Sequence, residues 1–153
     1  MENKVFCIKH EEANKLLKEI TDKNNSFLVV LNGENIQNLD EWLCAISENF
    51  HFPVYSEKEK KYISWYPSAF KYPSDKVEGW NGCDDWFTDL SWIESDIICL
   101  FIYNYSIFMK NDKCQKECIK DYIINNLLPW WEKDVVNCVV EGKTKKFNVY
   151  LVD

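Results

Sequence analysis

The sequence of 153 residues contains no arginine, and glycine occurs at only four positions. Neither the G-x-G-x-x-G motif nor the G-x-x-x-x-G-K-[ST] motif is present, so loops that cradle phosphate groups are not expected. The G-x-S-x-G motif of many hydrolases is missing as well. We therefore predict that the protein is not an enzyme and that it uses no cofactor.

Long apolar runs are also missing. The longest run, Ile97 to Tyr103, is far too short to cross a bilayer. The residues that follow Met1 lack the apolar stretch of a signal peptide. We therefore expect a cytoplasmic protein that makes no use of a membrane.

Cysteine occurs seven times without a regular spacing. In a reducing cytosol such residues are expected to be free thiols. Cys114 and Cys118 lie one helical turn apart, but a closed zinc site needs four ligands and no second pair has a suitable spacing. We predict no metal site. A reactive cysteine in an enzyme without a familiar motif stays open as an alternative.

Acidic residues outnumber basic ones by 25 to 18, which gives a net charge of −7. Such a chain repels the phosphates of nucleic acids and anionic lipids, whereas it attracts basic proteins. Solubility alone also explains a net negative charge, so charge does not decide between a binding role and a solvated surface.

Hydrophobic patterning predicts alternating strands and helices. Two short apolar runs, at 27–31 and 97–103, and the largely apolar segment 147–152 predict buried strands. Apolar residues at helical spacing predict helices over 10–22, from a cap at Asn38 or Asp40 to about residue 51, and over 81–90 and 113–128. This order predicts an α/β fold with a small three-stranded parallel sheet packed with helices. The stretch Val135 to Val140 is compatible with an extra C-terminal hairpin, turned at Gly142.

The stretch from Ser56 to Glu78 has no period and contains two prolines, which predicts a long loop. Its aromatic residues pack either against the domain itself or against a partner. The residues considered for such contacts are Trp65, Tyr66 and Phe70.

The segment from Trp80 to Trp92 stands out for its acidic and aromatic residues. On a helix, Asp85 and Asp89 share one face, with Asp84 beside them. Like charges four residues apart destabilise a helix slightly. The face is therefore either a solvated surface or one that is kept acidic for a partner.

Three motifs follow one another along the chain: the strand, turn and helix that begin Leu28-Val-Val-Leu-Asn-Gly, then Phe52-Pro-Val-Tyr55, then Trp80-Asn-Gly-Cys-Asp-Asp-Trp-Phe-Thr-Asp-Leu-Ser-Trp92. These motifs and their order resemble the barstar family, whose members inhibit bacterial ribonucleases inside the cell that secretes them. The resemblance implies a single barstar-like domain over 1–153. Residues 1–25 are then an N-terminal helical extension, and residues 56–78 are an insertion in the binding loop.

The resemblance also implies which residues meet the partner. Asp85 corresponds to the aspartate that enters the nuclease active site, and Tyr55 to an interface tyrosine. Asn81 stands where the family has a second aspartate, and Asp84 corresponds to an exposed interface position. With Asp89 and Trp80, these residues form the expected partner-binding set.

We therefore expect an antitoxin or immunity protein that blocks a basic ribonuclease or a related toxin, with a monomer favoured. The alternative is a barstar-fold interaction module that binds a different regulatory protein through the aromatic insertion at 62–72.

Overall fold

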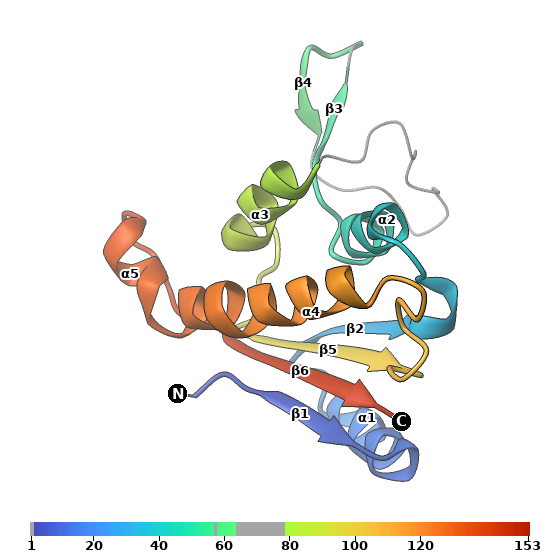
Figure 1. The fold of residues 1–153 in the computed structure, drawn as a ribbon. Coiled ribbons are helices and arrows are strands. Elements are labelled where there is room, and N and C mark those ends of the chain that lie inside the picture. The colour runs from blue at the N-terminus through green and yellow to red at the C-terminus, as the bar shows by residue number, and fades with distance from the viewer. Residues whose placement is uncertain (1, 57, 64–78) are drawn as a thin grey trace.

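The computed structural model describes residues 2–56, 58–63 and 79–153 and has at its centre a parallel sheet (Figure 1). The strands lie in the order β1-β6-β5-β2, and every neighbouring pair is parallel. Their bounds are Val5–Ile8 for β1, Phe27–Asn32 for β2, Ile97–Tyr103 for β5 and Lys146–Val152 for β6. The α/β class is confirmed.

The expected number of three strands is wrong, because β1 adds a fourth strand at the edge of the sheet beside β6. The N-terminal extension is thus a strand followed by a helix, not a helix alone. Four residues are too few to display a period, so the pattern of Val5–Ile8 alone does not predict β1.

The strand with the longest apolar run, β5, lies inside the sheet. β5 pairs with β2 on one side and with β6 on the other, and five of its seven residues are buried. β2 lies at the outer edge, and its Val30 side chain is 43% exposed. Continuous apolar runs suit strands that helices cover on both faces.

One face of the sheet is covered by α1 (His10–Lys23) (Figure 1). Ala13 of α1 is fully buried against this face, where Phe101 and Tyr150 stack at 4.4 Å. Glu11 and Glu12 lie in the first turn of α1, where negative charge is favourable. Asn24 ends α1 in the left-handed conformation.

The opposite face carries α2 (Leu39–Asn49), α3 (Trp80–Asp89) and α4 (Lys113–Tyr122) (Figure 1). The side chains of Asn38 and Asp112 cap α2 and α4 by accepting backbone N–H bonds. The main hydrophobic core lies between these helices and the sheet. Phe50 is at its centre, in contact with Phe87 at 4.9 Å and with Phe147 at 6.1 Å.

The last helical segment continues beyond Pro129, where the sequence predicts an end or a kink. After α4, a π-helical turn at Ile123–Leu127, a second one at Trp130–Asp134 and α5 (Val135–Cys138) follow without a break in helical structure. The hairpin considered at Val135–Val140 is therefore wrong. Contacts from other parts of the chain occupy carbonyls here: Asn3 Nδ2 donates to Leu128 O, and Lys145 N donates to Trp131 O.

A separate antiparallel hairpin of β3 (Val54–Ser56) and β4 (Lys61–Ile63) projects from the body beyond α2 and α3 (Figure 1). The predicted inserted loop at 56–78 thus begins with a strand and a turn, and residues 64–78 lie outside the described part. Within the described ranges, no helix has both the length and the apolar character that crossing a membrane requires.

Candidate protein-binding site on α3

The orientation of α3 follows from its apolar residues. Cys83, Phe87 and Leu90 recur at helical spacing, and all three are buried in the main core. Leu90 ends the helix in the left-handed conformation, and its N–H bonds to Trp86 O. The opposite face of α3 is consequently turned to solvent, and Asp85 and Asp89 are both exposed on it, as the sequence predicts.

Two tryptophans fix the C-terminal end of α3. Trp131 Nε1 donates to Phe87 O at 3.0 Å, and Trp130 Nε1 donates to Thr88 O at 2.8 Å. The last carbonyls of a helix have no donor within that helix. These two indoles therefore satisfy the helix end and hold it against the segment after Pro129. In the sequence, this role is signalled by the adjacent Trp-Trp pair alone.

A groove of about 550 Å³ lies between the C-terminal part of α3 and the segment that contains α5 and the turn after it. Asp85 and Asp89 line it on the α3 side, while Glu141 and Lys143 line it on the other side. Trp130 and Val135 are among its apolar lining residues. The groove thus combines carboxylates with apolar surface.

Lys145 also lines this groove, but its ammonium group is bound by the protein itself. Lys145 Nζ donates to Ile93 O and to Ser95 O, each at 2.8 Å. Burial lowers the pKa of Lys145, which the nearby Asp96 carboxylate partly opposes. Lys145 therefore serves to fasten the connection between α3 and β5.

Beside the groove, the end of α5 and the following residues expose apolar side chains. Val136 is 50% exposed, Val139 is 45% exposed and Val140 is 94% exposed. An apolar group that sits next to carboxylates suits a partner that presents both aliphatic and basic side chains.

Asp84 lies on a different side of α3 from the groove. Its Oδ1 atom accepts a hydrogen bond from the Tyr122 hydroxyl at 2.5 Å, and Trp80 packs edge-on against the Tyr122 ring at 4.9 Å. Burial, followed by the hydrogen bond to Asp84, raises the pKa of Tyr122. Asp84 and Trp80 are half-buried. Asp84 was expected at an exposed interface position, but its carboxylate instead contacts Tyr122 of α4.

The remaining predicted residues are divided between several places. Asn81 is exposed one turn before Asp85, so the two share a face with Asp89. Tyr55 lies in β3, in register with Tyr62 of β4. The insertion residues considered as contacts lie outside the described part of the chain: Trp65, Tyr66 and Phe70.

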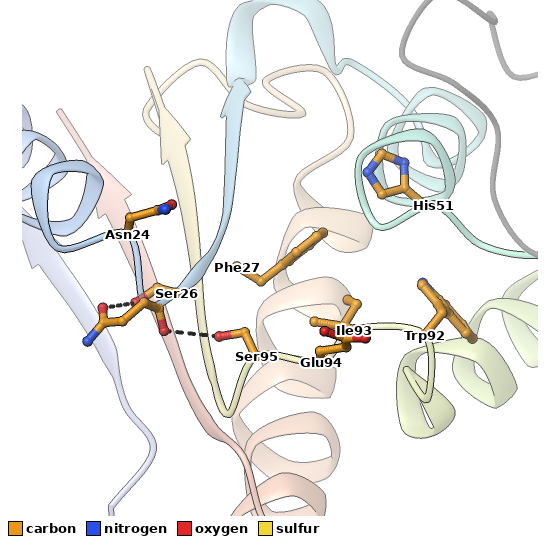
Figure 2. Close-up of a pocket in the computed structure, with 9 residues that line it drawn as sticks. Asn24, Ser26, Phe27, His51, Trp92, Ile93, Glu94 and Ser95 are labelled. Atoms are coloured by element: carbon orange, nitrogen blue, oxygen red, sulfur yellow. Dashed lines mark hydrogen bonds between the residues drawn. The ribbon is translucent and has the colours of Figure 1, made fainter.

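A second recess, of about 670 Å³, opens where β2 begins and α3 connects to β5 (Figure 2). Phe27, His51, Trp92 and Glu94 line it, and Ile93 lines both this recess and the groove. His51 has a φ of 57°, and burial lowers the pKa of its imidazole. The sequence does not predict this recess, because its lining residues come from segments that are distant in the chain.

The cysteines of the described part are all free, and no three His, Cys, Asp or Glu side chains there are grouped to hold a metal ion. Burial raises the pKa of Cys83 to about 12 and that of Cys99 to about 11. Thiols with raised pKa values carry little thiolate at neutral pH, so these two are poor nucleophiles.

Comparison of the chain with protein-family models, with curated proteins and with solved structures finds no match in any of the three.

Proposed function

We propose that this protein binds a basic protein partner through the solvent face of α3, and that it acts as a barstar-like inhibitor of a ribonuclease or related toxin. The observation that carries the proposal is that the carboxylates of Asp85 and Asp89 are exposed and unpaired among the described residues. Both carboxylates line the groove, and within the described residues neither of them forms an ion pair or a hydrogen bond.

Unpaired carboxylates on a rigid element are well suited to a cationic partner. Arg, Lys or protonated His groups make charge-assisted hydrogen bonds to carboxylates, which are shorter and stronger than neutral ones. The indole bonds of Trp130 and Trp131 already hold the end of α3 in place. Binding therefore requires little further ordering of the acidic face, which favours affinity.

The electrostatics of α3 itself also favour a binding role. Asp85 and Asp89 are four residues apart and repel each other. Asp89 is also the last residue of the helix, where the macrodipole disfavours negative charge. A basic partner relieves both effects. The resemblance in motif order to ribonuclease inhibitors supports a nuclease active site as the cationic surface.

The test is a binding and inhibition assay with basic bacterial ribonucleases and with any toxin encoded beside the gene. We expect at least one of them to form a complex and lose activity. Asp85→Asn should weaken that complex by about 30-fold or more, mainly through faster dissociation. Glu19→Gln, an exposed change on α1 at the opposite face of the sheet, is the matched control. Absence of any complex across the panel rejects the proposal.

A second candidate is an interaction module that uses the insertion. It is favoured by the projecting β3–β4 hairpin, where Tyr62 is 51% exposed and its ring lies 5.3 Å from that of Trp86. Replacing residues 64–78 by a short Gly-Ser linker separates the two candidates. If binding is retained, α3 carries it. If binding is lost while the unfolding transition is unchanged, the insertion carries it.

A further inference from the structure

The recess at the amino ends of β2 and β5 has features of its own (Figure 2). Phe27 lies in its middle, with Trp92 and His51 to one side and Asn24 and Ser26 to the other. None of these residues belongs to the acidic face of α3. The recess is nevertheless next to the groove of that face, because Ile93 lines both.

Most polar groups around the recess are already bonded within the protein. The Ser95 hydroxyl donates to Ile97 O at 2.9 Å or to Asn25 O at 3.1 Å, and Ser26 Oγ donates to Asn25 Oδ1. Trp92 Nε1 donates to Phe50 O at 2.8 Å, which closes the end of α2. These bonds fix the walls, so the recess is a formed feature of the fold.

Glu94 is the one carboxylate among the lining residues. Its side chain is exposed, and it forms neither an ion pair nor a hydrogen bond with the described residues. No lysine lines the recess. The pKa of His51 is lowered by burial, so near neutral pH its imidazole is mainly uncharged and does not cancel the carboxylate. The recess therefore carries a net negative charge.

Two aromatic rings accompany this charge. Phe27 and Trp92 both line the recess and are both half-buried, so part of each ring is open to the recess. The face of an aromatic ring attracts cations, and indole does so most strongly. Phe27 is held from behind by Phe50 at 5.8 Å, so it presents a fixed surface.

We infer that this recess binds the guanidinium group of an arginine side chain supplied by a partner protein. A guanidinium is planar, stacks on aromatic rings and forms paired hydrogen bonds with a carboxylate. An ammonium group is compact and more strongly hydrated, and it matches this combination less well. Because the chain has no arginine of its own, the group comes from another molecule.

A single basic protein that docks on α3 reaches the recess across Ile93, and this link rests on the proposed function. Binding of the guanidinium itself does not depend on it. The two are tested separately, because Asp85 lines the groove but not the recess.

The experiment is an NMR titration of the full chain with N-acetyl-arginine N-methylamide, followed through the indole N–H signal of Trp92. The uncharged N-acetyl-citrulline N-methylamide is the matched control ligand, since it has nearly the same shape. We expect a saturable shift with the arginine compound at millimolar concentration and none with the citrulline compound. Glu94→Gln should weaken binding about five- to tenfold. Asp85→Asn should leave binding of the arginine compound unchanged, while it should weaken binding of the protein partner.

Equal shifts with both compounds, or no saturable shift with either, overturn the inference. The inference is also overturned if the Glu94→Gln variant binds the arginine compound as well as the original protein does, because the carboxylate is then not part of the site. If free arginine binds much more tightly than the blocked compound, the ligand is a free amino acid, and the assignment to a partner protein is wrong.

Discussion

The hydroxyl of Tyr122 on α4 donates to the carboxylate of Asp84 on α3 at 2.5 Å, and this bond joins the two helices on the side away from the acidic groove. Trp80 packs on the same tyrosine ring. The contact helps to hold α3 in the orientation that turns Asp85 to solvent, so it supports the proposed binding face without belonging to it.

Tyr122→Phe should lower the free energy of unfolding by about 1–3 kcal/mol, because the half-buried Asp84 carboxylate then loses its donor. Urea denaturation measures this. Tyr103→Phe is a matched control, since the Tyr103 hydroxyl donates to Asn14 Oδ1 in an exposed position. Its loss should be less than about 1 kcal/mol, because water replaces the exposed bond. Equal decreases in the free energy of unfolding of the two variants would mean that the bond to Asp84 stabilises the protein no more than an exposed hydrogen bond does.

Stability should decrease as the pH rises above about 9. Burial is the main cause of raised pKa values in the folded protein, to about 12 for Cys83, about 11 for Cys99 and about 12 for Tyr105. The unfolded chain releases these protons near the ordinary values of 9.0 for cysteine and 10.0 for tyrosine. Above these values the unfolded state binds fewer protons than the folded state, so the free energy of unfolding decreases with pH.

The contribution of Cys99 to the loss of stability at high pH can be measured with a variant. Cys99→Ala should make the decline between about pH 9 and pH 11 less steep, since one group no longer titrates differently in the two states. Cys138→Ala, at an exposed thiol, is the control. Urea denaturation at a series of pH values gives the slopes. A slope that Cys99→Ala leaves unchanged would show that the thiol titrates alike in both states.

Trp131→Phe should destabilise the protein more than Trp130→Phe, and Trp86→Phe should have the smallest effect. Trp131 is buried and donates to Phe87 O, whereas the bond of Trp130 to Thr88 O is only partly buried. The Trp86 indole makes no hydrogen bond to a described residue. An unsatisfied buried carbonyl costs about 1–3 kcal/mol. Thermal or urea unfolding ranks the three, and a reversed order would contradict the role of these indoles at the helix end.

Local pattern alone predicts the elements that are long and strongly periodic. α1, α2 with its Asn38 cap, and β5 all occur at their expected places. β1 was not predicted, because an edge strand of four residues forms only when β6 is beside it.

The helix that continues past Pro129 was missed for a related reason. Its carbonyls at Leu128 and Trp131 bond to Asn3 and Lys145, which are remote in the chain. Local preference for a break is overruled by such contacts.

The candidate site was predictable in part. Spacing alone places Asp85 and Asp89 on one face, and both are exposed there. Spacing does not indicate that Asp84 turns toward Tyr122, nor that a recess forms from Phe27, Trp92 and Glu94. These features arise from packing between elements, which a single sequence does not display.

A test of α3 that needs no partner follows from the position of its carboxylates. Asp89→Asn should raise the free energy of unfolding by about 0.3–1 kcal/mol, because it removes both the repulsion with Asp85 and a negative charge at the helix C-terminus. Asp85→Asn should raise it by less, about 0.2–0.5 kcal/mol, because only the repulsion is relieved. Urea denaturation at low salt measures both, since salt screens these interactions.

The control variant should change the free energy of unfolding in the opposite direction. Glu11 lies in the first turn of α1, where the macrodipole favours a carboxylate, so Glu11→Gln should lower the free energy of unfolding. If Asp89→Asn destabilises the protein instead, the carboxylate contributes to the fold, and its exposure gives no reason to assign it to a partner. If the variant is more stable and binds the partner less well, the same side chain costs stability in the free protein and contributes affinity in the complex. A carboxylate that only kept the surface soluble would affect stability and leave binding unchanged.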